Sequence, residues 1–63
     1  MDPNANLEEQ RRLTQKLLSL TVGEADLPDL HSDAVRLAEL VEALDVWLTR
    51  GGFLPSEWQA LRP

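Results

Sequence analysis

The chain has 63 residues, no cysteine and a formal net charge of −5. A chain of this length forms one domain with a small core, and the lack of cysteine excludes disulfides and thiolate chemistry. With one histidine and no cysteine, a structural zinc site is also excluded. The hydrophobic fraction of 43% favours folding over disorder. These numbers indicate a small acidic domain of marginal stability, for which pairing with another chain is attractive.

Charge and hydropathy narrow the classes of partner. No apolar run approaches the length of a membrane span, and the polar start MDPNANLEE is not a signal peptide, so we expect no membrane binding and a cytoplasmic location. Residues 24–45 hold seven acids against one base, a local charge of −6, which disfavours direct binding to nucleic acid. An acidic surface suits a basic protein partner or imitates nucleic acid, and it also keeps small proteins in solution.

The first element is a helix expected over residues 3–20. Asp2 followed by Pro3 is a favoured start, because the aspartate caps the first turn and proline is pre-organised for the first helical position. Asn4 and Asn6 are alternative caps, the latter with a glutamate three residues later. The inner face combines leucines with two polar residues: Leu7, Gln10, Leu13, Thr14, Leu17, Leu18 and Leu20.

Residues 21–31 read as an acidic connection. Pro28 disfavours helix at the residue before it and excludes one long helix through this stretch. His31 lies close to Asp29 and Asp33, so a histidine–carboxylate pair is conceivable, but no nucleophile or enclosed pocket accompanies it. The acids also lack the spacing of a calcium loop. We therefore expect no enzyme activity, no metal site and no cofactor.

The clearest pattern is a helix expected over residues 32–50. Ser32 and Asp33 are candidate N-terminal caps, and Arg50 suits the negative end of the helix dipole. Apolar residues recur at helical spacing, which is typical of a face packed on a core. This expected core stripe consists of Ala34, Leu37, Leu40, Val41, Leu44, Trp47 and Leu48.

The segment after this helix predicts a stop and a return. Gly52 is the candidate for the left-handed position that ends the helix, which would place Phe53 back against the core. Pro55 suits the first position of a short third helix over residues 55–61. Trp58, three residues before a leucine, would face inward. Residues 1–63 therefore predict an all-α fold: a single domain in which two main helices form a hairpin closed by a short C-terminal helix.

A resemblance accompanies these patterns. The opening DPN and the run LAELVEALDVWLTRGGFLPSEW at residues 37–58 resemble short helical proteins of actinobacteria and their phages. The similarity covers most of the chain and is strongest in that run. It implies no activity that can be carried over, because the matching residues form the helix stripe, the glycine stop and the aromatic return. What it implies is an accessory factor.

The outward face of the main helix carries the functional hypothesis. Val35, Glu39, Glu42 and Val46 line up there, and exposed valines are poor choices in a helix needed only for solubility. They can instead be scattered surface residues, which are common. The leading prediction is a non-enzymatic protein-interaction module that binds an unidentified protein partner or a second copy of itself. The alternative is an acidic inhibitor or nucleic-acid mimic that occupies a basic site on its target.

Overall fold

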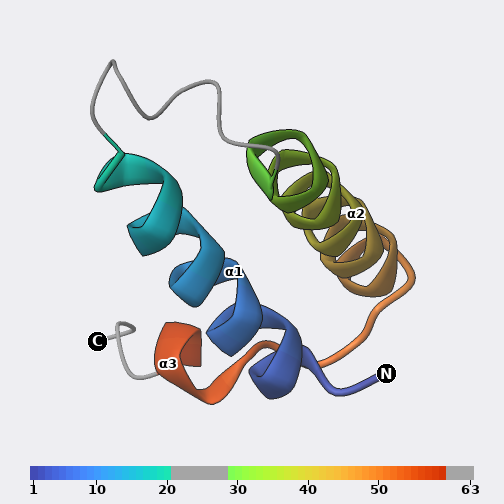
Figure 1. The fold of residues 1–63 in the computed structure, drawn as a ribbon. Helices are drawn as coiled ribbons and strands as arrows, with labels where there is room; N and C mark the ends of the chain where they lie inside the picture. The colour runs from blue at the N-terminus through green and yellow to red at the C-terminus, as the bar shows by residue number, and fades with distance from the viewer. Residues whose placement is uncertain (21–28, 60–63) are drawn as a thin grey trace.

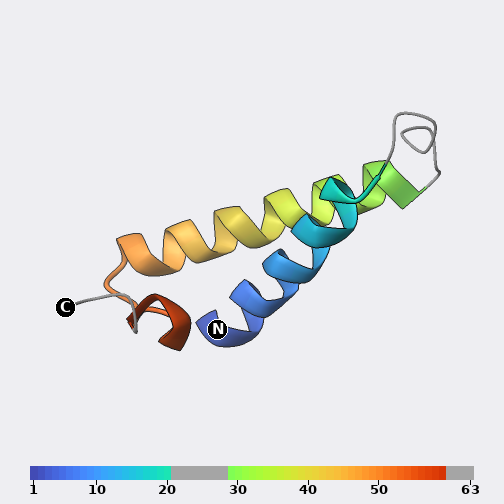
Figure 2. The same ribbon diagram turned by 90° about the vertical axis from the view of Figure 1, so that its left-hand side faces the viewer.

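A computed structural model of the chain describes residues 1–20 and 29–59, and the all-α prediction is confirmed. Its helices are α1 (Pro3–Leu18), α2 (Asp29–Thr49) and α3 (Ser56–Gln59). The two long helices lie side by side and run in opposite directions (Figure 1). The short α3 lies at the end where α1 begins and α2 finishes, against the N-terminal half of α1 (Figure 2).

The start of α1 follows the favoured prediction. Asp2 is the N-cap, and its carboxylate accepts hydrogen bonds from the backbone N–H groups of Asn4 at 3.0 Å and Ala5 at 3.3 Å. Pro3 occupies the first helical position, where its missing N–H costs nothing. Two donors that the helix itself cannot satisfy are therefore bonded by one local side chain.

The two asparagines considered as alternative caps have longer-range partners. The Asn4 side-chain oxygen accepts from the backbone N–H of Ser56 at 2.6 Å, so it satisfies a donor of the C-terminal turn. Asn6 is buried and donates from its amide to the carbonyl of Leu40 at 3.0 Å, while Gln10 donates to its oxygen at 2.6 Å. Both side chains tie α1 to residues more than thirty positions away.

The end of α1 lies at Leu18, two residues before the predicted end. The Ser19 hydroxyl donates to the carbonyl of Lys16 at 2.8 Å, and the Leu20 N–H donates to the carbonyl of Leu17 at 3.3 Å. A serine side chain and a tight turn thus satisfy carbonyls that would otherwise accept from a continuing helix.

The start of α2 corrects the sequence prediction. The helix begins at Asp29, three residues before the predicted start, so residues 29–31 of the predicted connection are helical. Residues 21–28 lie outside the described part. Ser32 and Asp33 are inside the helix and were wrong as N-caps. Asp33 instead forms an ion pair with Lys16 of α1, with Nζ and Oδ2 2.7 Å apart. Its carboxylate stabilises the contact between the helices and not the helix end.

The end of α2 is also corrected by one residue. Gly51, not Gly52, has the positive φ of +93°. The N–H of Gly51 donates to the carbonyl of Leu48 at 3.0 Å, and that of Gly52 to Trp47 at 2.9 Å, which is the Schellman pattern. Phe53 does not return to the core: it is 58% exposed and packs edge-on against the Trp47 ring.

The core lies between the two long helices and is smaller than the predicted stripe. Leu7 and Leu13 of α1 and Leu40 and Leu44 of α2 are its buried apolar members. Val41 is 49% exposed, so its assignment to the core was wrong. Ala34 is exposed as well, whereas Leu37, Trp47 and Leu48 are half-buried. One helix covers only a narrow strip of its neighbour, so the edges of a wide apolar stripe stay outside the contact.

The short α3 is held at the base of the hairpin. Pro55 precedes it and is fully buried, although residues 55–61 were predicted to be helical from the proline onwards. Glu57 lies 3.6 Å from Arg11 of α1, and the half-buried Trp58 borders a small hollow with Val41. Residues 60–63, including the leucine predicted to face inward, lie outside the described part.

Candidate functional site

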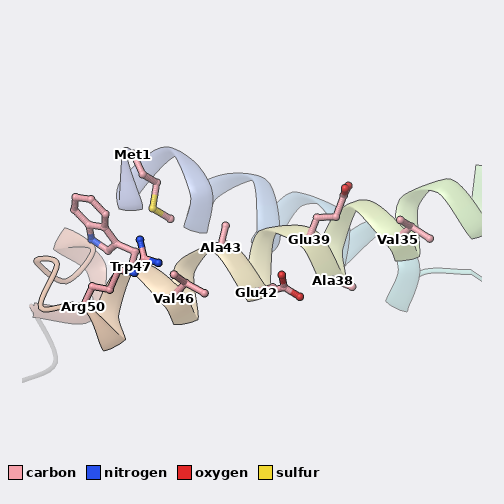
Figure 3. Close-up of a pocket in the computed structure, with 9 residues that line it drawn as sticks. All are labelled: Met1, Val35, Ala38, Glu39, Glu42, Ala43, Val46, Trp47 and Arg50. Atoms are coloured by element: carbon pink, nitrogen blue, oxygen red, sulfur yellow. The ribbon is translucent and has the colours of Figure 1, made fainter.

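The side of α2 that faces away from the core carries a shallow groove. It has a volume of about 690 Å³, and nearly all of its lining comes from α2 itself. Figure 3 shows the lining side chains spread along the helix, with the N-terminal methionine at the Trp47 end. The lining residues are Met1, Val35, Ala38, Glu39, Glu42, Ala43, Val46, Trp47 and Arg50.

The four residues singled out in the sequence all line this groove. Val35 and Val46 are 45% and 41% exposed, and Glu39 and Glu42 are exposed between them. At about 100° per residue the four lie within an arc of roughly 60°, and they extend over about 16 Å of helix. They therefore form one continuous stripe, here called the outer stripe, which ends in a valine on each side.

Two alanines lie beside the outer stripe, and a large aromatic ring lies at one end of the groove. Ala38 and Ala43 flank the outer stripe, and alanine lets another backbone or side chain approach the helix closely. Trp47 stands at the C-terminal end, where its indole N–H donates to the carbonyl of Phe53 at 3.0 Å. The rings of Trp47 and Phe53 are 5.5 Å apart between centroids and almost perpendicular, which is a favourable aromatic geometry.

Gly52 completes the support of the tryptophan. A side chain at this position would overlap the indole ring of Trp47, so the ring rests directly on the glycine backbone. Trp47 was predicted as a core residue, yet it is half-buried and belongs both to the hairpin and to the groove. A ring held by a hydrogen bond, an aromatic neighbour and a glycine is a rigid wall, and a rigid wall loses little conformational entropy when a partner binds.

The carboxylates of the outer stripe differ from those at the α1–α2 contact. Glu9 accepts two hydrogen bonds from the Arg36 guanidinium, at 2.9 and 3.0 Å, and this bonding lowers the pKa of Glu9 and raises the pKa of Arg36. Among the described residues, Glu39 and Glu42 have no cation within ion-pair distance. Arg36 attracts Glu39 only from a distance, because its hydrogen bonds go to α1.

The functional hypothesis from the sequence did not include five of the nine lining residues: Met1, Ala38, Ala43, Trp47 and Arg50. Helical spacing places Arg50 on the outward face, four residues after Val46, but the functional hypothesis did not include it. Trp47 was assigned to the core because its helical spacing places it on the expected core stripe. Met1 is 53% exposed and reaches the groove from the other end of the chain, and no pattern within α2 predicts that.

Other chemistry that the sequence raised is not assembled in the described part of the chain. His31 lies exposed in the first turn of α2, and residues 1–20 and 29–59 contain no cluster of three potential metal-ligating side chains. Every buried side-chain polar atom in these ranges has a hydrogen-bond partner, so none is left aimed at a missing ligand. None of the described helices has both the length and the apolar character of a membrane span.

Comparison with known proteins adds no assignment to this geometry. The resemblance of residues 37–58 to short actinobacterial and phage proteins stays a prediction. The hypothesis that the outer stripe binds a partner likewise rests on the position and chemistry of its four side chains. The chain matches no protein family, no curated protein and no solved structure with which it was compared.

Proposed function

We propose that this protein is a non-enzymatic protein-interaction module that binds another protein through the outer groove of α2. The observation that carries the proposal is the outer stripe. A half-exposed valine lies at each end of the stripe. The two carboxylates between them form no ion pair with any residue that the structure describes. The stripe is part of a regular helix whose opposite side is fixed to α1. Such a surface is preformed, so a partner need not order it.

Residue choice supports a binding role for the valines. Valine is a weaker helix former than lysine, glutamate or alanine because its branched side chain loses rotamer freedom in a helix. At an exposed position it contributes no core contact in return. A partner that buries Val35 and Val46 would recover part of that loss through the hydrophobic effect, and this is the recognition mode of a helix lying along a groove.

The expected affinity is modest. Full burial of a valine side chain stabilises by about 1.5–3 kcal/mol, and these two are already about half-buried. Association costs about 4–15 kcal/mol in lost translational and rotational freedom. The valines alone do not offset that cost, so Met1, Trp47 and the two carboxylates have to contribute. A reversible contact, typical of accessory factors that exchange partners, fits these magnitudes.

The lining also supports a role without catalysis. The groove contains no histidine, serine, threonine or lysine, so of the common catalytic side chains only the carboxylates of Glu39 and Glu42 are present. Both glutamates are exposed to water, whereas catalytic carboxylates are usually held in a desolvated cleft. The arrangement of apolar ends and acidic centre suits recognition of a surface better than chemistry on a small molecule.

The acidic-mimic alternative has weaker support. A mimic needs an array of free negative charges, but Asp33, one of the acids in the charged stretch, forms its ion pair with Lys16 inside the protein. The acids at positions 24 and 26 lie outside the described residues. Ionic strength separates the two functions by degree: binding by a mimic should weaken steeply with salt, whereas binding through the valines and only two carboxylates should weaken much less.

The test is a double variant, Val35→Ser with Val46→Glu, used to capture proteins from an extract of the natural host. A matched control is Leu18→Glu, which places a charge at a leucine that is 76% exposed and lies away from the groove. We expect both variants to keep their helical circular dichroism. The double variant should bind a partner of the native chain at least tenfold more weakly, about 1.4 kcal/mol. The control should bind it unchanged.

Two results would contradict the proposal. If the double variant folds and retains the same partners at full strength, the valines are scattered surface residues and the contact lies elsewhere. If the double variant unfolds while the control does not, the valines contribute to the fold, and their exposure does not indicate a binding face.

A further inference from the structure

The outer stripe has an order and spacing that restrict what can cover it. Its side chains run apolar, acidic, acidic, apolar, with intervals of four, three and four residues. The intervals are the same in both directions along the helix. A second helix can therefore match the stripe whether it lies parallel or antiparallel to α2, provided that its own contact residues have the same intervals.

A second copy of the chain has the right intervals but the wrong charges. In the antiparallel register that pairs Val35 of one copy with Val46 of the other, Glu39 of each copy faces Glu42 of the other. In a parallel pair, each glutamate faces its own counterpart. Both arrangements bring four carboxylates together at the centre of the interface, where like charges are strongly unfavourable once water is excluded.

A shifted antiparallel register does not remove the conflict. Arg50 can be placed opposite Glu39 or Glu42 of the second copy, which would neutralise part of the charge. Either shift moves Val35 opposite residue 54 or beyond, past the end of the second α2 at Thr49. The pairing that satisfies the charges therefore leaves one apolar end of the stripe uncovered. None of these symmetric pairings satisfies both the valines and the glutamates.

Resting on the proposed function, we infer that the outer stripe of α2 binds an amphipathic helix of a different protein. The contact residues of that helix are apolar, basic, basic and apolar at intervals of four, three and four. Its apolar side chains cover Val35 and Val46 beside Ala38 and Ala43. Its basic side chains meet Glu39 and Glu42. Arginine suits these two places better than lysine, because a guanidinium binds a carboxylate through two parallel hydrogen bonds.

The first experiment uses synthetic helical peptides as probes. One peptide carries Leu, Arg, Arg and Leu at the stated intervals. A second has the same composition but with both arginines moved to the opposite side of the helix. Titration followed by the backbone amide signals of α2 measures each dissociation constant. The first peptide should bind at least tenfold more tightly, with the largest signal changes between Val35 and Val46. Equal affinities would overturn the inference.

Variants of the protein test whether the two glutamates are responsible. Glu39→Gln with Glu42→Gln should abolish the preference between the peptides. The control, Glu8→Gln with Asp45→Asn, removes the same charge at residues that do not line the groove and should keep the preference. Glu39→Lys with Glu42→Lys should reverse it, so that a peptide with Leu, Glu, Glu and Leu binds more tightly. If the control pair behaves like the groove pair, the effect is net charge and the inference is wrong.

Sedimentation separates a failure of this inference from a failure of the proposed function. The native chain should stay monomeric into the millimolar range, and Glu39→Leu with Glu42→Leu should self-associate at least tenfold more tightly. If the native chain instead forms a dimer that Val46→Glu abolishes, the second copy is the occupant; the inference then fails and the interaction face survives. If no peptide binds and the capture experiment also finds no loss in the valine variant, both fail.

Discussion

The two sides of α2 handle their polar groups differently. On the side toward α1, Asp33 lies 2.7 Å from Lys16, and the carbonyl of Leu40 accepts from the buried amide of Asn6. On the outer side, the carboxylates of the groove have no ion-pair partner among the described residues. Polar groups that hold the fold together are thus matched within the chain. Glu39 and Glu42, beside the exposed valines, face solvent, and under the proposed function they are the groups that a partner binds.

The largest expected difference between the two sides concerns their apolar residues. Leu44 is only 3% exposed, so Leu44→Ala should lower the free energy of unfolding by about 2–5 kcal/mol through lost transfer energy and a cavity. That is enough to unfold much of so small a domain. Val46→Ala, two residues away but in the groove, should change it by less than about 0.5 kcal/mol. Urea unfolding followed by circular dichroism measures both, and similar losses would show that the two sides are not distinct.

The next largest effect concerns the buried asparagine of the inner side. Asn6→Ala should destabilise by about 1–3 kcal/mol, because it removes the bond to Leu40 and leaves the Gln10 amide without its acceptor. Asn6→Asp is the matched control for the donor, since a carboxylate of similar size cannot donate to a carbonyl. Both variants should melt at a lower temperature than the native chain. An unchanged melting temperature in either would mean that this bond does not hold the helices together.

The glycine pair tests the boundary between the two sides. Gly51→Ala should cost about 1 kcal/mol, because φ is +93° there and a Cβ strains that conformation. Gly52→Ala acts differently: the new methyl group displaces the Trp47 indole, so the hydrogen bond to Phe53 is broken. The indole N–H signal should shift strongly in the Gly52 variant and little in the Gly51 variant. The same shift in both would contradict the assignment of separate roles.

The smallest effect is the pH dependence of the surface ion pairs at the inner side. Hydrogen bonding to Arg36 lowers the pKa of Glu9 below its ordinary value of 4.5, so its contribution is present above that pH and is lost as the pH falls through the lower, folded value. Stability of the native chain should therefore decline in acid more steeply than that of Glu9→Gln. The difference should narrow at high salt, because the Arg36 side chain is exposed and that of Glu9 is partly exposed. If the stabilities of the two proteins change with pH in the same way, the Glu9–Arg36 pair does not contribute to stability.

The same linkage has the opposite sign for Lys16. Its pairing with Asp33 raises the pKa of the lysine above 10.5, so that contribution is present below this pH and is lost as the pH rises through the folded value. The native chain should therefore be more stable than Lys16→Met at neutral pH, and this difference in stability should disappear in strong alkali. Urea unfolding at several pH values measures it.

Much of the architecture was predictable because it depends on neighbours in the sequence. Helical periodicity, the Asp2–Pro3 start and the glycine-rich stop after α2 are local features, and each was recognised from a few adjacent residues. The position of the outer stripe was predictable for the same reason, since helical geometry alone places Val35 and Val46 on one face. Its binding role is a proposal that this periodicity cannot decide.

Other features depended on residues that are distant in the sequence. Asp33 could cap a helix or pair with Lys16, and only the approach of α1 selects the ion pair. Asn6 could have capped α1, and only the position of the Leu40 carbonyl makes it a buried donor. Met1 likewise reaches the groove through the packing of the N-terminus against α2. The sequence determined which surfaces each helix presents, because a helix has a fixed geometry. The tertiary structure decided which of those surfaces are satisfied, because packing brings together side chains that no local pattern relates.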